Sequence, residues 1–224
     1  MKKIAYIKTD FTTKFGLPRQ SGLIEGITGK IVFQKEYRAQ EAFRGLDEYS
    51  HIWVLWEFSK AKQDNWSPTV RPPLLGGNKR MGVFATRSPF RPNPIGLSCV
   101  KLLKIDYLDE EGPVLYVSGV DIMDDTPIYD IKPYLPYADS VPNAVGGFTE
   151  NLKERRLQVN APKDILNILP KEKRDTLLKV LESDPRPSYI DDDERVYGFL
   201  FAGYEIKFTV CGDVVTLKEI TQAQ

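Results

Sequence analysis

The stretch Ser50-His-Ile-Trp-Val-Leu-Trp-Glu-Phe58 is rich in β-branched and aromatic residues and is nearly continuously apolar. A short run of this kind predicts a β-strand that is buried on both faces. On either side of it, apolar runs predict further strands at residues 3–9, 28–33, 81–86, 95–105, 114–120 and 128–131. A short helix is favoured only at residues 39–46. The first 140 residues are therefore expected to be mainly β.

Prolines at positions 89, 92 and 94 exclude a helix or a central strand from residues 87–94. Because proline fixes its own φ, this segment is expected to be a stiff loop that holds Arg87, Arg91 and Asn93 in fixed positions. Guanidinium groups held in this way suit the recognition of an anion. The alternative is a rigid crossover between strands whose arginines are merely solvated.

The composition changes at residues 133–147, a loop rich in proline and glycine. We place the domain boundary there, with a first domain at residues 1–140 and a second at residues 141–224. A helix is predicted at residues 170–182, with Pro170 in its first turn. Strands are predicted at residues 148–159, 195–200, 204–210 and 214–220, the last two forming a hairpin around Cys-Gly-Asp. The second domain is thus expected to be small and α+β.

The charges are balanced overall but unevenly distributed. With 31 basic and 31 acidic side chains the net charge is zero, which argues against a strong attraction of the whole protein to nucleic acid. Residues 65–105, the acid-free segment, contain no Asp or Glu but seven Lys and Arg. This segment indicates either a local site for phosphate, carboxylate or nucleic-acid backbone, or a solvated basic surface.

Several classes of protein are excluded by what the sequence lacks. No run of 18 apolar residues predicts a membrane helix, and the N-terminus lacks the apolar region of a signal peptide. Cys99 and Cys211 are the only cysteines and His51 the only histidine, so no zinc site or disulfide scaffold is expected and no metal is predicted. His51 is interpreted as structural. Both cysteines lie in apolar runs, which is typical of buried thiols in a cytosolic protein.

The stretch Gly119-Val-Asp-Ile-Met-Asp-Asp-Thr-Pro-Ile-Tyr-Asp-Ile-Lys-Pro-Tyr134 places four acids after a predicted strand. A carboxylate beside an arginine would orient it, whereas a desolvated carboxylate could accept a proton. Turn-forming aspartates without chemistry are an equal alternative. A metal-dependent hydrolase is disfavoured, because the acids crowd into one turn and His51 is the only histidine.

The segment Arg80-Met-Gly-Val-Phe-Ala-Thr-Arg-Ser-Pro-Phe-Arg-Pro-Asn-Pro-Ile-Gly-Leu-Ser98 resembles the signature of the TsaA-like (TrmO) family of tRNA methyltransferases. The resemblance extends, in order along most of the chain, to Lys14-Phe-Gly-Leu-Pro-Arg-Gln20, Ser50-His-Ile-Trp-Val-Leu55, Thr69-Val-Arg-Pro-Pro-Leu-Leu-Gly-Gly-Asn78, Asp130-Ile-Lys-Pro-Tyr134 and Asp184-Pro-Arg-Pro-Ser-Tyr189. It implies a single-sheeted TsaA-like β-barrel followed by a small α+β C-terminal domain.

The same resemblance implies a function. It points to a cytoplasmic homodimer that binds S-adenosylmethionine near the subunit interface. The methyl group would go to N6 of threonylcarbamoyl-adenosine beside the anticodon of tRNA. The alternative is a non-enzymatic barrel that binds S-adenosylmethionine or a nucleotide and acts as a sensor.

Carried over by position, the resemblance predicts cofactor contacts at Gln20, Ser21, Gly22, Ser59, Lys60, Arg87, Leu97, Gly119, Val120, Asp121 and Ile122. Within this set, Arg87 is expected to pair with the methionine carboxylate. Contacts with the anticodon loop are expected from Arg71, Arg80, Arg91, Asn93 and Lys132. By residue type alone, Asp130 and Tyr134 are the candidates that could accept the N6 proton.

Overall fold

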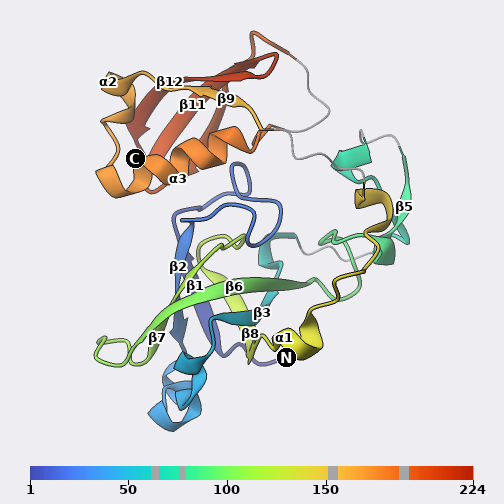
Figure 1. The fold of residues 1–224 in the computed structure, drawn as a ribbon, viewed down its shortest axis with the longest axis vertical. Coiled ribbons are helices and arrows are strands. Elements are labelled where there is room, and N and C mark those ends of the chain that lie inside the picture. Colours follow the sequence, from blue (N-terminus) through green and yellow to red (C-terminus); the bar gives the residue numbers. More distant parts are fainter. Residues whose placement is uncertain (62–65, 76–78, 151–155, 187–191, 224) are drawn as a thin grey trace.

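The structure, a computed structural model, describes residues 1–61, 66–75, 79–150, 156–186 and 192–223. Six antiparallel strands close into a barrel, in the lower part of Figure 1. Their hydrogen-bonded order is β1-β2-β7-β6-β3-β8, with β8 pairing back to β1. The strands are β1 (Ala5–Thr9), β2 (Thr28–Phe33), β3 (His51–Glu57), β6 (Ile95–Asp106), β7 (Val114–Ser118) and β8 (Thr126–Pro133). The expected β-barrel is confirmed.

Side chains alternate along β3, so the prediction that this strand is buried on both faces is wrong. Ile52 and Val54 are fully buried inside the barrel, whereas Trp53 and Leu55 are half-buried on its outer wall. In a closed barrel only the inner face of each strand reaches the core. The sequence looked continuously apolar because outward-facing residues of β3 are also apolar.

Residues 81–86 do not form one strand as predicted. Only β5 (Met81–Gly82) is a strand, paired with β4 (Thr69–Val70), and a 3₁₀ turn follows at Val83–Ala85. Thr86 closes this turn, since its N–H and its hydroxyl both donate to the carbonyl of Val83, at 3.1 and 2.8 Å. The described residues between 66 and 91 form an arm beside the barrel, which we call the β4–β5 arm (Figure 1).

The helix predicted at residues 39–46 is also different in the structure. Two 3₁₀ segments, Gln40–Phe43 and Leu46–Glu48, take its place, separated by Gly45 in a left-handed conformation with φ of 81°. Other 3₁₀ turns occur at Lys35–Tyr37, Ser59–Ala61, Pro73–Leu75 and Gly147–Thr149. No described helix is both long and apolar enough to cross a membrane.

The second part of the chain is a four-stranded sheet with short helices, at the top of Figure 1. Its strands are ordered β10 (Tyr197–Phe201), β11 (Tyr204–Cys211), β12 (Val214–Gln222) and β9 (Gln158–Asn160), and its helices are α2 (Lys163–Leu166) and α3 (Lys171–Glu182), after α1 (Pro136–Asp139) at the end of the barrel. The predicted helix and hairpin are confirmed. The strand predicted at residues 148–159 is wrong apart from β9, and residues 151–155 lie outside the described residues.

The loop after β1, residues 10–22, packs against this second part rather than lying free at the surface. Phe15 lies with its ring centroid 6.3 Å from that of Phe199, and Phe11 is 5.2 Å from Phe201. The Lys173 ammonium of α3 also pairs with the Asp10 carboxylate at 2.5 Å. Buried apolar residues of both parts therefore form one continuous core.

Candidate active site

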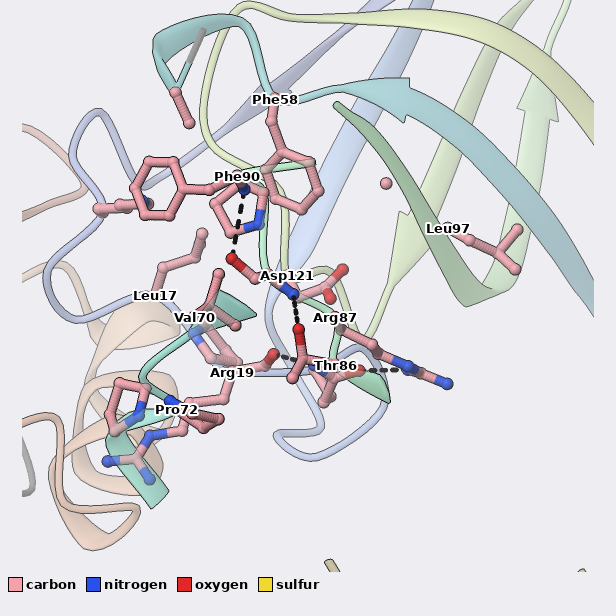
Figure 2. A pocket seen from close by; sticks show the side chains of 18 of the residues that line it. Leu17, Arg19, Phe58, Val70, Pro72, Thr86, Arg87, Phe90, Leu97 and Asp121 are labelled. Carbon is pink, nitrogen blue, oxygen red and sulfur yellow. Dashed lines mark hydrogen bonds between the residues drawn. The ribbon is translucent and has the colours of Figure 1, made fainter. Parts of the chain in front are cut away.

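A large pocket opens between the end of the barrel, the β4–β5 arm and the second part of the chain. Its walls come from the loop after β1, the end of β3, the start of β6, the arm and the end of α3. In the view of Figure 2, Thr86, Arg87 and Asp121 lie near the centre, Phe58 and Phe90 lie above them, and Arg19, Val70 and Pro72 lie to their left. Segments distant in the sequence thus share one cavity.

Two glycines bring the loop after β1 against the end of β7. Gly119 has a φ of +77°, which suits glycine, and its carbonyl accepts a hydrogen bond from the N–H of Gly22 at 2.9 Å. A Cβ atom on Gly119 would lie 3.3 Å from the backbone of Gly22. This close backbone contact places residues 20–22 beside residues 119–122, two of the segments predicted to bind the cofactor.

Asp121 is held by a chain of side-chain hydrogen bonds across the barrel end. The Ser98 hydroxyl donates to its Oδ1 at 2.5 Å, and the Trp56 Nε1 donates to the Ser98 Oγ at 2.9 Å. Gly96 makes room for this arrangement, because a Cβ there would lie 2.2 Å from the Trp56 ring. Burial raises the pKa of Asp121, while the Ser98 hydrogen bond and the Arg87 charge oppose the rise. A carboxylate fixed in this way can accept hydrogen bonds from a bound ligand.

Arg87 follows the 3₁₀ turn of the arm and contacts Gln20 through a hydrogen bond from its Nη1 to the Oε1. The loop behind it is braced by its own polar groups. The Ser88 N–H donates to the Thr86 Oγ1 at 3.2 Å, and the Arg91 Nη1 donates to the Thr86 carbonyl at 3.1 Å. Residues 87–94 contain neither helix nor strand, as predicted. The exposed guanidinium of Arg87 is therefore positioned at the pocket wall while remaining open to an anion.

Of the remaining residues predicted to bind the cofactor, three line the pocket, two have side chains buried in the core, and one, Ser21, does neither. Ser59, Lys60 and Leu97 line the pocket, and the Lys60 Nζ donates to the carbonyl of Thr12 at 3.1 Å. The side chains of Val120 and Ile122 are buried in the core, so only their backbone atoms could meet a ligand. The Ser21 hydroxyl accepts a hydrogen bond from the N–H of Cys99 at 3.1 Å.

The predicted catalytic residues do not line this pocket. Asp130 forms an ion pair with Lys132 at 3.3 Å, and Tyr134 packs 5.8 Å from Trp53. The Tyr134 N–H donates to the carbonyl of His51, at the end of β3 opposite to the pocket. Within one chain, Asp130, Lys132 and Tyr134 are thus separated from the pocket.

The other two aspartates of the Asp-rich stretch have turn-forming and ion-pairing roles. Asp125 pairs with Lys8 at 2.5 Å, and Asp124 accepts a hydrogen bond from the N–H of Thr9 at 2.9 Å. The turn-forming interpretation therefore holds for this pair. Among the described residues, no three His, Cys, Asp or Glu side chains group as a metal site would require.

The residues predicted to contact tRNA lie mostly on the pocket wall. Arg71, Arg80, Arg91 and Asn93 line it, and the Arg80 Nη1 donates to the Thr69 Oγ1 at 2.8 Å across the arm. Arg19, Arg156 and Arg186, which are not among the predicted site residues, also line the pocket, where the buried Arg186 is paired with Asp184 at 2.9 Å. No spacing in the sequence could have found them, because the packing of the second part against the loop brings them there.

Glu57 is a further pocket residue that the sequence reasoning missed. It is 4% exposed at the end of β3, and its carboxylate lies 3.8 Å from the Lys3 Nζ. Burial, together with a hydrogen bond to Glu57, raises the pKa of Tyr129 to about 12. The sequence analysis treats this position only as part of an apolar strand, although a single acid within such a strand is a signal for a buried carboxylate.

The fold and this site define a class of two-part proteins in which a closed β-barrel carries a polar pocket and a small α+β unit adds to its rim. Residues 6–140 match the family model of the tRNA-methyltransferase O N-terminal domain, and residues 154–223 match that of the TrmO C-terminal domain. The chain belongs to the TrmO family.

Similar proteins extend over nearly the whole chain. The tRNA (adenine(37)-N6)-methyltransferase of Escherichia coli strain K12 is 38% identical over 217 residues, covering 93% of this chain and 92% of that protein. The enzyme of the same name from Eikenella corrodens is 44% identical over 164 residues, covering 72% and 91%. The crystal structure of TrmO from Pseudomonas aeruginosa superposes with a TM-score of 0.78 at 29% identity, covering 98% of this chain and 97% of that one.

Proposed function

We propose that this protein is an S-adenosylmethionine-dependent methyltransferase that methylates N6 of adenosine 37 in tRNA, where the base carries a threonylcarbamoyl group. The convergence of Gly22, Arg87 and Asp121 in one pocket, with Gly22 held there by its hydrogen bond to Gly119, carries the proposal. Relatives named as tRNA (adenine(37)-N6)-methyltransferases, similar over both parts of the chain, favour an enzyme over a barrel that only binds.

The donor set of the pocket fits S-adenosylmethionine. Arg87 suits the methionine carboxylate, and Asp121 suits the ribose hydroxyls or the adenine edge. At Gly22 a Cβ would meet nothing within 4 Å, which leaves open space for a ligand next to its backbone. When bound, S-adenosylmethionine supplies a methyl group already activated by its sulfonium, so the protein has mainly to orient the acceptor and exclude water.

We further propose that the protein is a cytoplasmic homodimer. Asp130 and Tyr134 are retained as candidates to accept the N6 proton, with Lys132 as a substrate contact. Since none of the three lines the pocket of its own chain, these roles require that the second subunit bring them to the site. We keep the domain boundary at residue 140, with the barrel binding the cofactor and residues 141–224 helping to position tRNA.

The proposed function can be tested by incubating the protein with purified tRNA and S-adenosylmethionine that carries a labelled methyl group. Label should enter tRNA that carries the threonylcarbamoyl group, and tRNA without it should remain unlabelled. Cofactor binding without transfer to either tRNA would favour the sensor alternative.

Mixed dimers test the shared site. Arg87→Ala and Asp130→Asn should each be inactive alone, and mixing the two should restore activity, because one site of a mixed dimer keeps both groups. Light scattering that gives the monomer mass of 25.5 kDa at micromolar concentration with cofactor present would contradict the dimer. Cell fractionation tests the location.

A further inference from the structure

Two exposed aromatic side chains form a pair on the β4–β5 arm. Trp66 and Phe84 are 52% and 72% exposed, and their ring centroids lie 6.2 Å apart with an interplanar angle of 30°. The guanidinium carbon of Arg91 lies 5.9 Å from the centroid of the Phe84 ring. Large apolar side chains grouped at a surface mark interaction sites more often than single ones do.

The charges around the Trp66–Phe84 pair indicate which chemical class of ligand it would bind. Both rings lie within the acid-free segment, and Phe84 and Arg91 also line the pocket. A second ring and cation occur on the same pocket wall, where the Lys14 Nζ lies 5.7 Å from the centroid of the Phe90 ring. Aromatic rings alternating with cations suit unpaired nucleic acid, because each base offers a flat π-face and each linkage a phosphate.

We propose that Trp66 and Phe84 form a stacking platform for unpaired bases of the anticodon loop, beside the base that enters the pocket. This proposal rests on the proposed function, in that it takes tRNA as the substrate. Phe84 receives a base on its exposed ring, Trp66 extends the surface, and Arg91 supports Phe84 while its charge attracts the neighbouring phosphate. The platform positions the loop and takes no part in the methyl transfer itself.

Binding of a synthetic anticodon stem-loop to Trp66→Leu and Phe84→Leu tests the platform. Leucine keeps an apolar side chain but removes the π-face, so each variant should weaken binding by about 5- to 150-fold. The salt dependence of binding should stay as in the wild type, because stacking releases no counterions. Trp66→Phe should retain most of the affinity.

Tyr116→Leu is the matched control, since Tyr116 is a half-buried aromatic residue of β7 with the cations of Lys30 and Lys104 beside its ring, outside the arm and the pocket. It should bind the stem-loop as the wild type does. A stem-loop with abasic positions flanking the target adenosine should bind the wild type and both leucine variants equally weakly, because the stacking partner is then missing.

Three results would overturn the platform. The first is leucine variants that bind the intact stem-loop like the wild type. The second is a loss of affinity that the abasic stem-loop shows to the same degree. The third is a molecular mass of the leucine variants, measured by light scattering, that differs from that of the wild type, because this would place the two rings in a contact between subunits. If the wild type neither binds nor methylates tRNA, the proposed function itself fails; if it does both while the variants are unaffected, only the platform fails.

Discussion

The carboxyl group of Asp121 is buried, and burial favours its neutral form. The hydrogen bond from the Ser98 hydroxyl and the charge of the Arg87 guanidinium favour its ionised form. Its pKa in the folded protein is raised above the ordinary 3.8. The stabilising contribution of the residue is therefore fully present below that ordinary value and is lost as the pH rises through the raised pKa.

Asp121→Asn should test this reading, because asparagine cannot ionise. The melting temperature of the variant should rise relative to that of the wild type as the pH increases from about 4 to 7, while its affinity for S-adenosylmethionine should fall. Asp139→Asn is a control of opposite sign, since hydrogen bonds from the Leu135 N–H and Trp53 lower the pKa of Asp139. That variant should lose stability relative to the wild type as the pH rises from about 2 to 4, and above about pH 4 the difference should stay constant, because the contribution of a carboxylate with a lowered pKa is complete above its ordinary value.

Arg87→Ala should abolish methyl transfer and leave the fold intact, because the side chain is exposed and contributes little to the core. Losing a bidentate pair with a carboxylate costs about 2–5 kcal/mol, so cofactor affinity should fall by tens to thousands of fold. Calorimetry measures this, with Lys101→Ala as the control for loss of an exposed charge on the barrel wall. Unchanged binding by Arg87→Ala would remove this residue from the site.

At the scale of structural elements, the turn after β7 contacts the loop after β1 through the backbone hydrogen bond between Gly119 and Gly22. Gly119→Ala should destabilise the protein by about 1–2 kcal/mol through its left-handed backbone. It should also weaken cofactor binding, because the new Cβ lies 3.3 Å from the backbone of Gly22. Gly203→Ala shares the positive φ, at +80°, but no atom lies within 4 Å of its Cβ. That control should lose similar stability, measured by denaturant unfolding, and keep its cofactor affinity.

The β4–β5 arm presents Arg71, Arg80 and Arg91 to the pocket. If these side chains contact phosphates of the anticodon loop, each neutral variant (Arg→Gln) should reduce the slope of log affinity against log salt by about 0.7. The Arg71 and Arg80 variants should leave cofactor binding largely unchanged, whereas Arg91→Gln also removes the hydrogen bond to Thr86 that braces the loop of Arg87. Filter binding across a salt series measures the slope. A slope that responds only to a base of the second part outside the pocket, such as Arg195, would instead place tRNA on that part of the chain.

For the whole molecule, the continuous core couples the second part of the chain to the cofactor pocket. Phe199 of β10 packs against Phe15, and a Cβ on Gly16 would lie 2.4 Å from its ring. Phe199→Ala should therefore cost about 3–5 kcal/mol of stability and also weaken cofactor binding, because the loop that carries residues 20–22 loses its support.

Phe43→Ala provides the comparison, since Phe43 is equally buried but packs on Phe33 in the 3₁₀ region of the barrel. A similar loss of stability with normal cofactor affinity is expected there. Equal effects on affinity, measured by calorimetry well below both melting temperatures, would argue against coupling through the loop.

Features that depend on neighbours in the chain could be predicted from the amino-acid sequence. The strands at residues 28–33 and 95–105, the start of α3 after Pro170, the hairpin around Gly212 and the stiff loop at residues 87–94 all follow from local periodicity, proline and glycine. The resemblance of these local motifs also indicated the family and its barrel.

Features that depend on closure of the barrel and on packing between its parts required the tertiary structure. The apolar residues of β3 could not show which face was inside, since only closure decides that. Burial of Asp121, separation of Tyr134 from the pocket and contact between Trp66 and Phe84 arise from residues brought together across long stretches of chain. Local propensity carries no information about such contacts, because their energy exists only once the chain has folded.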